Sequence, residues 1–154
     1  MSKIIFMNGS PNKNGNTVRI GEELLKDNSY DILHMVDYRV DQYGSVTEND
    51  EIVKIFKQLE DKDIILIGTP VYWYTVGGIL KTFIDRLYML PEARILKGKK
   101  LYFFAQGSAP DEGTVKTIEH LVNRVAKLMN MDLKCVVVGS NNGNKIINMM
   151  NIES

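Results

Sequence analysis

The chain has 154 residues, of which 44% are hydrophobic and 25% are charged. These values are typical of one soluble globular domain, and we expect a single domain over residues 1–154. The 19 basic residues balance the 19 acidic residues, so the chain lacks the excess of positive charge on which nucleic-acid binding depends. We therefore expect no nucleic-acid partner.

Membrane, secretion and metal signals are also missing from the sequence. No apolar run approaches the roughly 18 residues of a membrane-spanning helix, and the turn at Asn8-Gly9 follows Lys3 too soon for a secretion signal. The single cysteine, Cys135, has no partner for an intrachain disulfide, and its apolar neighbours favour a buried thiol. No Cys or His cluster has the spacing of a metal site. We expect a cytoplasmic protein with no metal site and no membrane contact.

Five short apolar runs alternate with segments of helical periodicity. This alternation is typical of βαβ units that build a parallel sheet. The run Ile64–Ile67 is apolar at every position, as expected for a strand covered on both faces. The predicted strands are Lys3–Met7, Tyr30–Val36, Asp63–Gly68, Lys100–Ala105 and Leu133–Gly139.

Between the strands, four segments place apolar residues at helical spacing. They are Thr17–Lys26, a helix that opens at Thr47 and carries Ile52, Ile55, Phe56 and Leu59, and the segments Val76–Tyr88 and Thr114–Met129. Five parallel strands joined by four right-handed crossovers predict a three-layer, doubly wound α/β domain.

The C-terminal segment departs from this pattern. Lys145–Ile152 is long enough for only one or two helical turns, so we expect a short tail in place of a full last helix. One face of the sheet would then need another cover. We expect this Met-rich tail or a partner subunit to supply it.

The loop after the first strand is rich in hydrogen-bond donors. It reads Gly9-Ser10-Pro11-Asn12-Lys13-Asn14-Gly15-Asn16-Thr17 and leads directly into a helix. Hydroxyls and free backbone N–H groups at a helix N-terminus can bind an anion. The same residues fit a polar turn with an N-cap at Asn16 or Thr17, and the loop matches neither the P-loop nor the dinucleotide-binding motif.

Two further loops carry unusual residues. The segment Thr69–Gly78 contains Tyr72-Trp73-Tyr74, three aromatic residues in what we expect to be a surface loop. They suit the stacking of a flat aromatic ligand, and they also suit a subunit interface. The segment Ala105–Gly113 offers small residues beside Gln106, which also fits a plain connection between a strand and a helix.

Together these segments resemble the flavodoxin-like family of NAD(P)H-dependent FMN reductases. The resemblance is carried by Gly9–Thr17, by Thr69–Tyr74 and by Leu80–Arg86, and it extends from about Ile4 to Met131. It implies a five-stranded sheet of order 2-1-3-4-5, FMN bound at the carboxyl edge of that sheet, and a homodimer with the flavin near the interface.

The resemblance also implies which residues hold FMN. The phosphate would be held by Ser10, Asn12, Asn16 and Thr17. The isoalloxazine ring would be lined by Pro70, Val71, Tyr72 and Trp73 on one side and approached by Gln106, Gly107 and Ser108 on the other. Two departures from the family pattern stand out. Asn12 replaces the usual Arg, which leaves Lys13 as the nearest cation, and Tyr38–Ser45 has no cysteine for the iron–sulfur cluster of some members.

The implied activity is electron transfer from NAD(P)H through FMN to a small acceptor such as a flavin or a quinone. The cofactor carries this chemistry, so we assign no catalytic residue. The alternative is a flavodoxin-type electron carrier without efficient NAD(P)H reactivity, but the neutral charge and the long phosphate loop favour the reductase. We expect His34 and His120 to be structural or solvated.

Overall fold

Each predicted strand is present, and a sixth short strand joins the third. The computed structural model describes residues 1–154. Its strands are β1 (Ile4–Asn8), β2 (Tyr30–His34), β3 (Ile64–Tyr72), β4 (Thr75–Val76), β5 (Lys100–Gly107) and β6 (Asp132–Ser140). Five strands pair in parallel in the order β2-β1-β3-β5-β6, while β4 pairs antiparallel with β3. Without β4, this is the predicted order.

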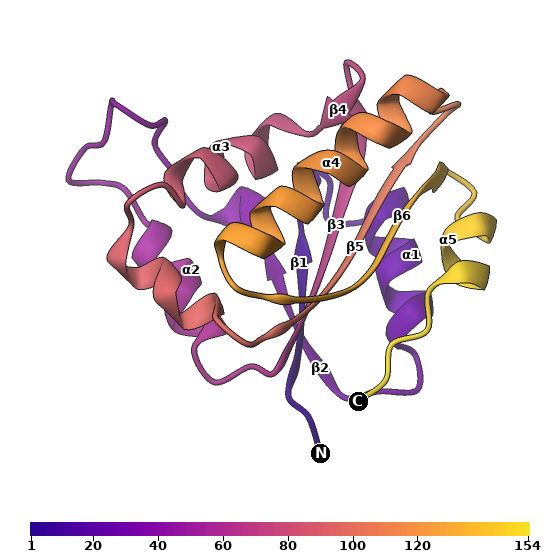
Figure 1. Cartoon of the computed structure of the whole chain (residues 1–154), viewed down its shortest axis with the longest axis horizontal. Coiled ribbons are helices and arrows are strands. Elements are labelled where there is room, and N and C mark those ends of the chain that lie inside the picture. Colours follow the sequence, from indigo (N-terminus) through magenta and orange to yellow (C-terminus); the bar gives the residue numbers. More distant parts are fainter.

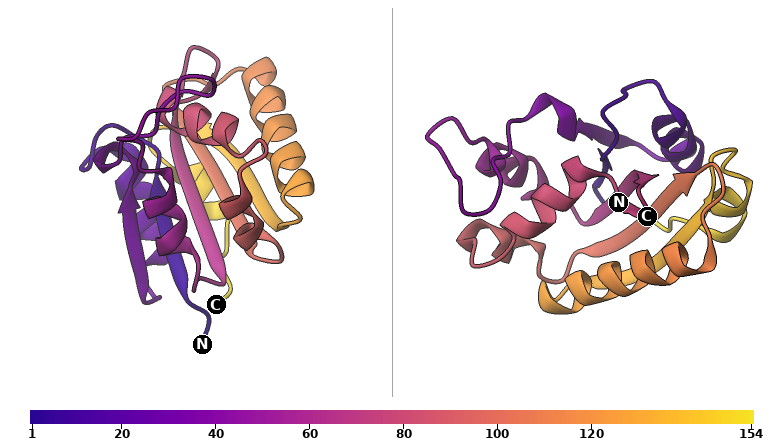
Figure 2. Two further views of the ribbon diagram at one scale, coloured as in Figure 1. Left: turned by 90° about the vertical axis from the view of Figure 1, so that its left-hand side faces the viewer. Right: turned by 90° about the horizontal axis from the view of Figure 1, so that it is seen from above.

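Helices cover both faces of the sheet, which confirms the three-layer α/β architecture. The helices are α1 (Asn16–Leu25), α2 (Ile52–Leu59), α3 (Gly78–Arg86), α4 (Glu112–Leu128) and α5 (Asn144–Met149), with 3₁₀ turns η1 (Met35–Asp37) and η2 (Pro91–Leu96). α2, α3 and α4 lie on one face, and α1 and α5 lie on the other (Figure 1; Figure 2). No helix is long and apolar enough to cross a membrane.

The sheet separates two apolar cores because successive strand residues point to opposite faces. Ile5 and Ile65 belong to the core beneath α2, α3 and α4, whereas Ile64 and Leu66 belong to the core beneath α1 and α5. Each fully buried aliphatic side chain contributes about 1.5–3 kcal/mol. The uniformly apolar run of β3 therefore has a direct cause, since both of its faces are covered.

The C-terminal tail covers the second face of the sheet. Ile146, Met150 and Ile152 are buried in the core that α1 also covers. Arg19 of α1 fastens the tail by donating hydrogen bonds to the carbonyl oxygens of Asn141 and Asn142, at 2.8 and 3.1 Å. Of the two covers expected from the sequence, the Met-rich tail is the one that the structure shows.

Several predicted boundaries were wrong, among them the end of the third strand, which is Tyr72 and not Gly68. The second strand ends at His34, not Val36, because the chain turns into η1. The helix expected to open at Thr47 begins at Ile52, since the hydroxyl and N–H of Thr47 bond to a carboxylate outside the helix. The helix expected from Val76 begins at Gly78, because Val76 pairs with β3.

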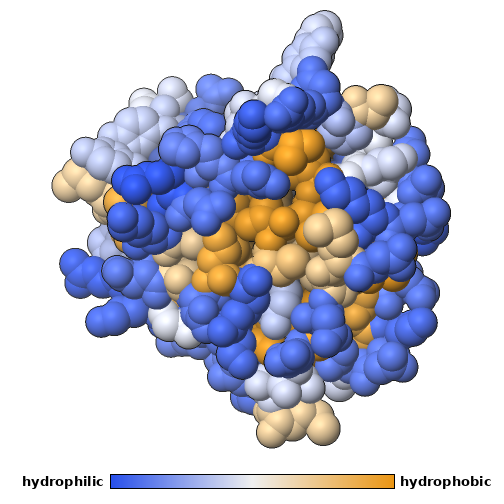
Figure 3. Space-filling view, turned by 45° about the vertical axis from the view of Figure 1, so that its right-hand side comes forward, coloured by the Kyte–Doolittle hydropathy of each residue, from blue (hydrophilic) through white to orange (hydrophobic).

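An apolar surface lies on the face formed by α4, β6 and α5. Figure 3 shows apolar side chains gathered in the middle of this face with hydrophilic side chains around them. The half-buried apolar residues on these elements include Leu121, Val125, Cys135, Val136 and Ile147. Cys135, which was expected to be buried, is therefore only half-buried. This partial burial is enough to raise the pKa of its thiol.

Candidate functional site

Three loops meet where β1, β3 and β5 end. The N–H of Gly9 donates to the carbonyl oxygen of Gly68 at 2.8 Å, and a Cβ at Gly9 would lie only 2.9 Å from that oxygen. Farther along the edge, the Gln106 amide donates to the Thr17 hydroxyl at 3.0 Å, in a buried bond. The structure thus brings the loops after β1, β3 and β5 together at the point where the strand order reverses, a common ligand site in such sheets.

A relay of side chains shapes the loop after β1. The Asn8 carboxamide accepts the N–H of Ser10, the Ser10 hydroxyl accepts the N–H of Asn12, and the Asn12 carboxamide accepts the N–H of Asn14, all at 2.9–3.0 Å. Each bond spans two residues, the pattern by which Asn and Ser stabilise tight turns. The loop is therefore preformed.

Asn8 is a positioning residue that was not predicted from the sequence. It is fully buried, its amide donates to the carbonyl oxygen of Asn12 at 3.3 Å, and the same nitrogen lies 3.0 Å from Nδ1 of His34 on β2. The only feature of the sequence that could have indicated this role is the polar side chain of Asn8 at the end of an otherwise apolar strand. His34 has the structural role that we expected.

The first turn of α1 is free of side-chain caps. Gly15 is the N-cap and makes no capping hydrogen bond, so the alternative of an N-cap at Asn16 or Thr17 was wrong. Asn16 is exposed, while Thr17 is buried and its hydroxyl accepts the bond from Gln106. An uncapped helix start carries a partial positive charge of about half an elementary charge. This terminus can therefore accept an anion.

Lys13, the cation nearest to this loop in the sequence, is engaged in an ion pair. Its ammonium group pairs with Asp37 of η1 at 2.5 Å. Both side chains are about half exposed, and such pairs contribute only about 0–1 kcal/mol. Backbone N–H groups and hydroxyls are therefore the donors in place at the start of α1.

The segment expected to be a loop after the third strand is a tight hairpin. Val71 pairs with Val76 and Tyr72 with Thr75, which leaves Trp73 and Tyr74 at the tip. Both have positive φ, at 47° and 66°, a conformation that costs about 1–2 kcal/mol for each residue that is not glycine. Trp73 is nonetheless 92% exposed. Strain of this kind concentrates at functional sites.

Buried hydrogen bonds hold the base of the hairpin. The Thr69 hydroxyl accepts the N–H of Gly77 at 3.0 Å and donates to the carbonyl oxygen of Pro70 at 2.9 Å. Thr69 itself is fully buried. The exposed aromatic tip therefore stands on a fixed base.

A cleft of about 320 Å³ opens between the hairpin and the end of β5, within the size range of small-molecule sites. Four of the residues expected to contact the ring line it, namely Val71, Trp73, Gly107 and Ser108. Pro70 and Gln106 instead lie within paired strands, and Tyr72 lies on the hairpin outside the lining. Ser10, Asn12, Asn16 and Thr17 also lie outside this lining. Of these four residues, Thr17 is hydrogen-bonded to Gln106, which directly precedes Gly107 of the lining.

Asp111 gives the rim of the cleft a negative charge. Its carboxylate accepts the N–H of Thr114 at 2.7 Å as the N-cap of α4, and this bond holds the pKa of Asp111 below its usual range. A second anion is disfavoured beside it. The cleft therefore suits an uncharged group, whereas the start of α1 suits a charged one.

Comparison with known proteins identifies the family. The sequence model described as NADPH-dependent FMN reductase matches residues 2–145. This chain belongs to the NADPH-dependent FMN reductase family. An iron–sulfur flavoprotein of Archaeoglobus fulgidus is 34% identical to this family member over 99 residues, which cover 56% of the chain and 49% of that protein. A second iron–sulfur flavoprotein of that organism is covered to 62%, so the chain spans about half to three-fifths of these relatives.

Other relatives match along most of their length. The provisionally named NAD(P)H-dependent FMN-containing oxidoreductase YwqN of Bacillus subtilis is 27% identical, and the match covers 91% of this reductase-family chain and 86% of YwqN. Among solved structures, the Trp repressor binding protein of Bacillus subtilis has a TM-score of 0.74 at 22% identity, over 94% of this chain and 92% of that one. An NADH:FMN oxidoreductase has a TM-score of 0.66 at 23% identity, over 92% and 77%. These structures show that the family member has the flavodoxin-like fold.

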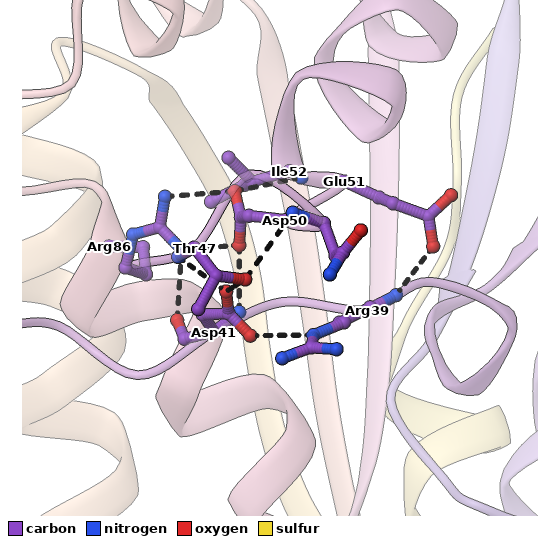
Figure 4. Close-up of polar contacts among 8 residues, drawn as sticks. Arg39, Asp41, Thr47, Asp50, Glu51, Ile52 and Arg86 are labelled. Atoms are coloured by element: carbon purple, nitrogen blue, oxygen red, sulfur yellow. Dashed lines mark hydrogen bonds and ion pairs between the residues drawn. The ribbon is translucent and has the colours of Figure 1, made fainter. Parts of the chain in front are cut away.

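In this family member, a polar network occupies the segment between η1 and α2. Arg86 of α3 donates to both carboxylate oxygens of Asp50 at 2.6 and 3.0 Å and to the carbonyl oxygen of Asp41 at 2.9 Å (Figure 4). The Asp41 carboxylate accepts bonds from Thr47 and Arg39, and these lower its pKa to about 2. The network ties the segment 39–51 to the helix that follows the hairpin, a contact with no sequence signal.

The Arg86–Asp50 pair gives a prediction for stability. Both side chains are less than one-tenth exposed. Arg86→Met leaves the buried Asp50 carboxylate without its charged partner, with only the N–H groups of Asp41 and Ile52 still donating to it, and should lower the free energy of unfolding by about 3 kcal/mol at pH 7. Arg86 also lowers the pKa of Asp50. Its stabilising contribution is therefore complete above the ordinary pKa of Asp, about 4, and is lost as the pH falls through the lowered value.

Urea unfolding between pH 7 and pH 3 checks this prediction. The difference between the wild type and Arg86→Met should narrow below about pH 4. Lys116→Met removes an exposed pair with Glu112 and should change stability by less than about 1 kcal/mol. An Arg86→Met variant as stable as this control would contradict a stabilising role for the network.

Proposed function

We propose that this chain binds FMN and acts as an NAD(P)H-dependent reductase that passes electrons to a small acceptor such as a flavin or a quinone. Family membership supports this proposal. The observation that carries it is the position of an uncapped helix start beside an aromatic cleft, with the Gln106–Thr17 hydrogen bond between them.

The start of α1 fits the phosphate of FMN. The first-turn N–H groups of Asn16 and Thr17 and the hydroxyl of Ser10 supply donors without a lysine or arginine. The Ser10 oxygen already accepts the N–H of Asn12, which leaves its hydrogen for a phosphate oxygen. Hydrogen bonds to a charged phosphate are roughly twice as strong as neutral ones.

The cleft fits the uncharged ring of the same ligand. Its aromatic wall is Trp73 and Tyr74, and its other wall is the backbone of Gly107 and Ser108. A phosphate would be repelled there by Asp111, so FMN would bind with its phosphate at α1 and its ring toward the hairpin. The residues present thus fit both ends of the cofactor.

When bound, FMN supplies the redox chemistry, by accepting a hydride from NAD(P)H and passing electrons to the acceptor. The protein supplies binding, orientation and shielding. The hydrogen bonds of Thr69 hold the base of the hairpin that carries Trp73 and Tyr74. The hydrogen bonds that Asn8, Ser10 and Asn12 accept hold the loop after β1. Trp73, highly exposed, is available to stack on a flat ligand.

Asn16→Asp tests the phosphate site without weakening the fold. A carboxylate in the first turn of a helix stabilises that helix by about 0.3–1 kcal/mol, yet it places a negative charge against the phosphate. FMN affinity, measured by quenching of flavin fluorescence, should fall at least tenfold, about 1.4 kcal/mol, while thermal stability is kept. Asn123→Asp, an exposed position on α4, should leave FMN affinity unchanged. Equal FMN affinity in both variants would contradict this phosphate site.

Anaerobic mixing with NADH or NADPH tests the activity. The flavin absorbance of the FMN-loaded protein should bleach within seconds, because a nicotinamide can reach the ring from the open side of the cleft. The bleaching rate is measured by stopped flow. A flavin that stays oxidised for many minutes with both nucleotides would favour the electron carrier instead.

We further propose that the chain forms a homodimer through the apolar surface of α4, β6 and α5. Edge strands and contiguous apolar patches are favoured sites of association. Sedimentation should give twice the chain mass at micromolar concentration. Met149→Lys, at an exposed position on α5, should shift the chain toward monomer, whereas Met89→Lys, exposed after α3, should not. A wild-type monomer would refute this interface.

A further inference from the structure

A second groove lies at the opposite edge of the sheet from the FMN site. It is bounded by the C-terminal ends of α3 and α4 and by η2, where the chain enters β5 and β6. Its volume is about 380 Å³, within the range of small-molecule sites. Buried Leu87 and Ala93 and half-buried Leu90 and Met129 contribute to its lining, so much of its wall is apolar.

Two exposed apolar side chains extend this wall outward. Met89 is 83% exposed and Leu128 is 63% exposed, and both line the groove. Met89 has a positive φ of 53°, a strained conformation for a residue with a side chain. Asn130 has the same φ, and its carbonyl oxygen accepts the N–H of Gly98 at 2.8 Å. The apolar side chains of Met89 and Leu128 are therefore held in contact with water at the rim of the groove. A bound ligand would cover them.

Two cations line the same groove without a protein partner. Arg94 of η2 and Lys97 just after it belong to none of the ion pairs and to none of the side-chain hydrogen bonds of the structure. No acidic residue lines the groove. Positive charge beside an apolar surface is complementary to a molecule with one anionic end and an apolar body.

We propose that this groove binds a small monocarboxylate with an apolar tail. The tail would cover Met89 and Leu128, and the carboxylate would lie against Arg94 and Lys97. Arg94 can bind a carboxylate through two parallel N–H donors, which adds geometric selectivity. The site is separate from the FMN site, and ligand binding here does not require the proposed reductase activity.

The test uses FMN-loaded protein labelled with ¹³C at its methionine methyl groups. Two methionines, Met89 and Met129, line the groove, so their signals report binding directly, and bound FMN keeps its own site closed to the probe. Titration with octanoate should shift these two signals with a dissociation constant below about 1 mM, or about −4 kcal/mol. Octylammonium has the same tail with the opposite charge and should bind at least tenfold more weakly.

The double variant Arg94→Glu/Lys97→Glu should weaken octanoate binding at least tenfold. Lys57→Glu is the matched control, because Lys57 is an exposed cation on α2 that is also outside the ion pairs; it should leave the affinity unchanged. The rate at which NADH bleaches the flavin absorbance should be equal in the wild type, the double variant and Lys57→Glu. This measurement separates the groove proposal from the proposed reductase function.

Three results would overturn the proposal. One is the absence of a shift at Met89 and Met129 at millimolar octanoate. Another is a shift confined to other methionines. The third is equal binding of octanoate and octylammonium, which needs no variant to interpret and would show that the two cations select nothing.

Discussion

Two-sided burial of the central strands is the constraint on which the rest of this structure depends. β1 and β3 are apolar on both faces, and each face is closed by its own layer of helices. Water and polar ligands are thereby excluded from the body of the sheet. Polar chemistry is left to the ends of the strands, where backbone groups have no partner in the next strand. The cleft beside the hairpin lies at the carboxyl edge of the sheet, and the groove beside η2 lies at the amino edge.

Much of the fold could be predicted from local sequence patterns, because a strand that is buried on both faces is apolar at every position. The strand order came from the resemblance to the flavodoxin-like reductases, but the layers were predicted correctly because of this burial pattern. The end of the third strand was not, since Pro70 is a residue that normally interrupts a central strand. Pro70 is tolerated because β1 has already ended, its last residue pairing with Gly68, so Pro70 pairs only with Gln106 of β5. Such relative strand lengths cannot be read from one segment alone.

In the candidate site, too, features made by neighbouring residues could be predicted, whereas contacts between residues far apart in the sequence could not. The loop from Ser10 to Thr17 was recognisable because each of its turns is made by neighbouring residues. Contacts across the chain were not recognisable. The Arg86–Asp50 pair was not predicted, and neither was the hydrogen bond that Gln106, expected to approach the flavin ring, donates to Thr17. Lys13 looked like a replacement for a missing arginine and instead pairs with Asp37.

The hairpin tip has a spectroscopic consequence. Trp73 is the only tryptophan of the chain and is almost wholly in solvent, so all indole emission of the protein originates at one wall of the cleft. A chromophore that absorbs where indole emits would quench this emission when it binds against that wall. The molecule therefore carries a built-in optical probe, and a change in its emission reports occupancy of this cleft without a label.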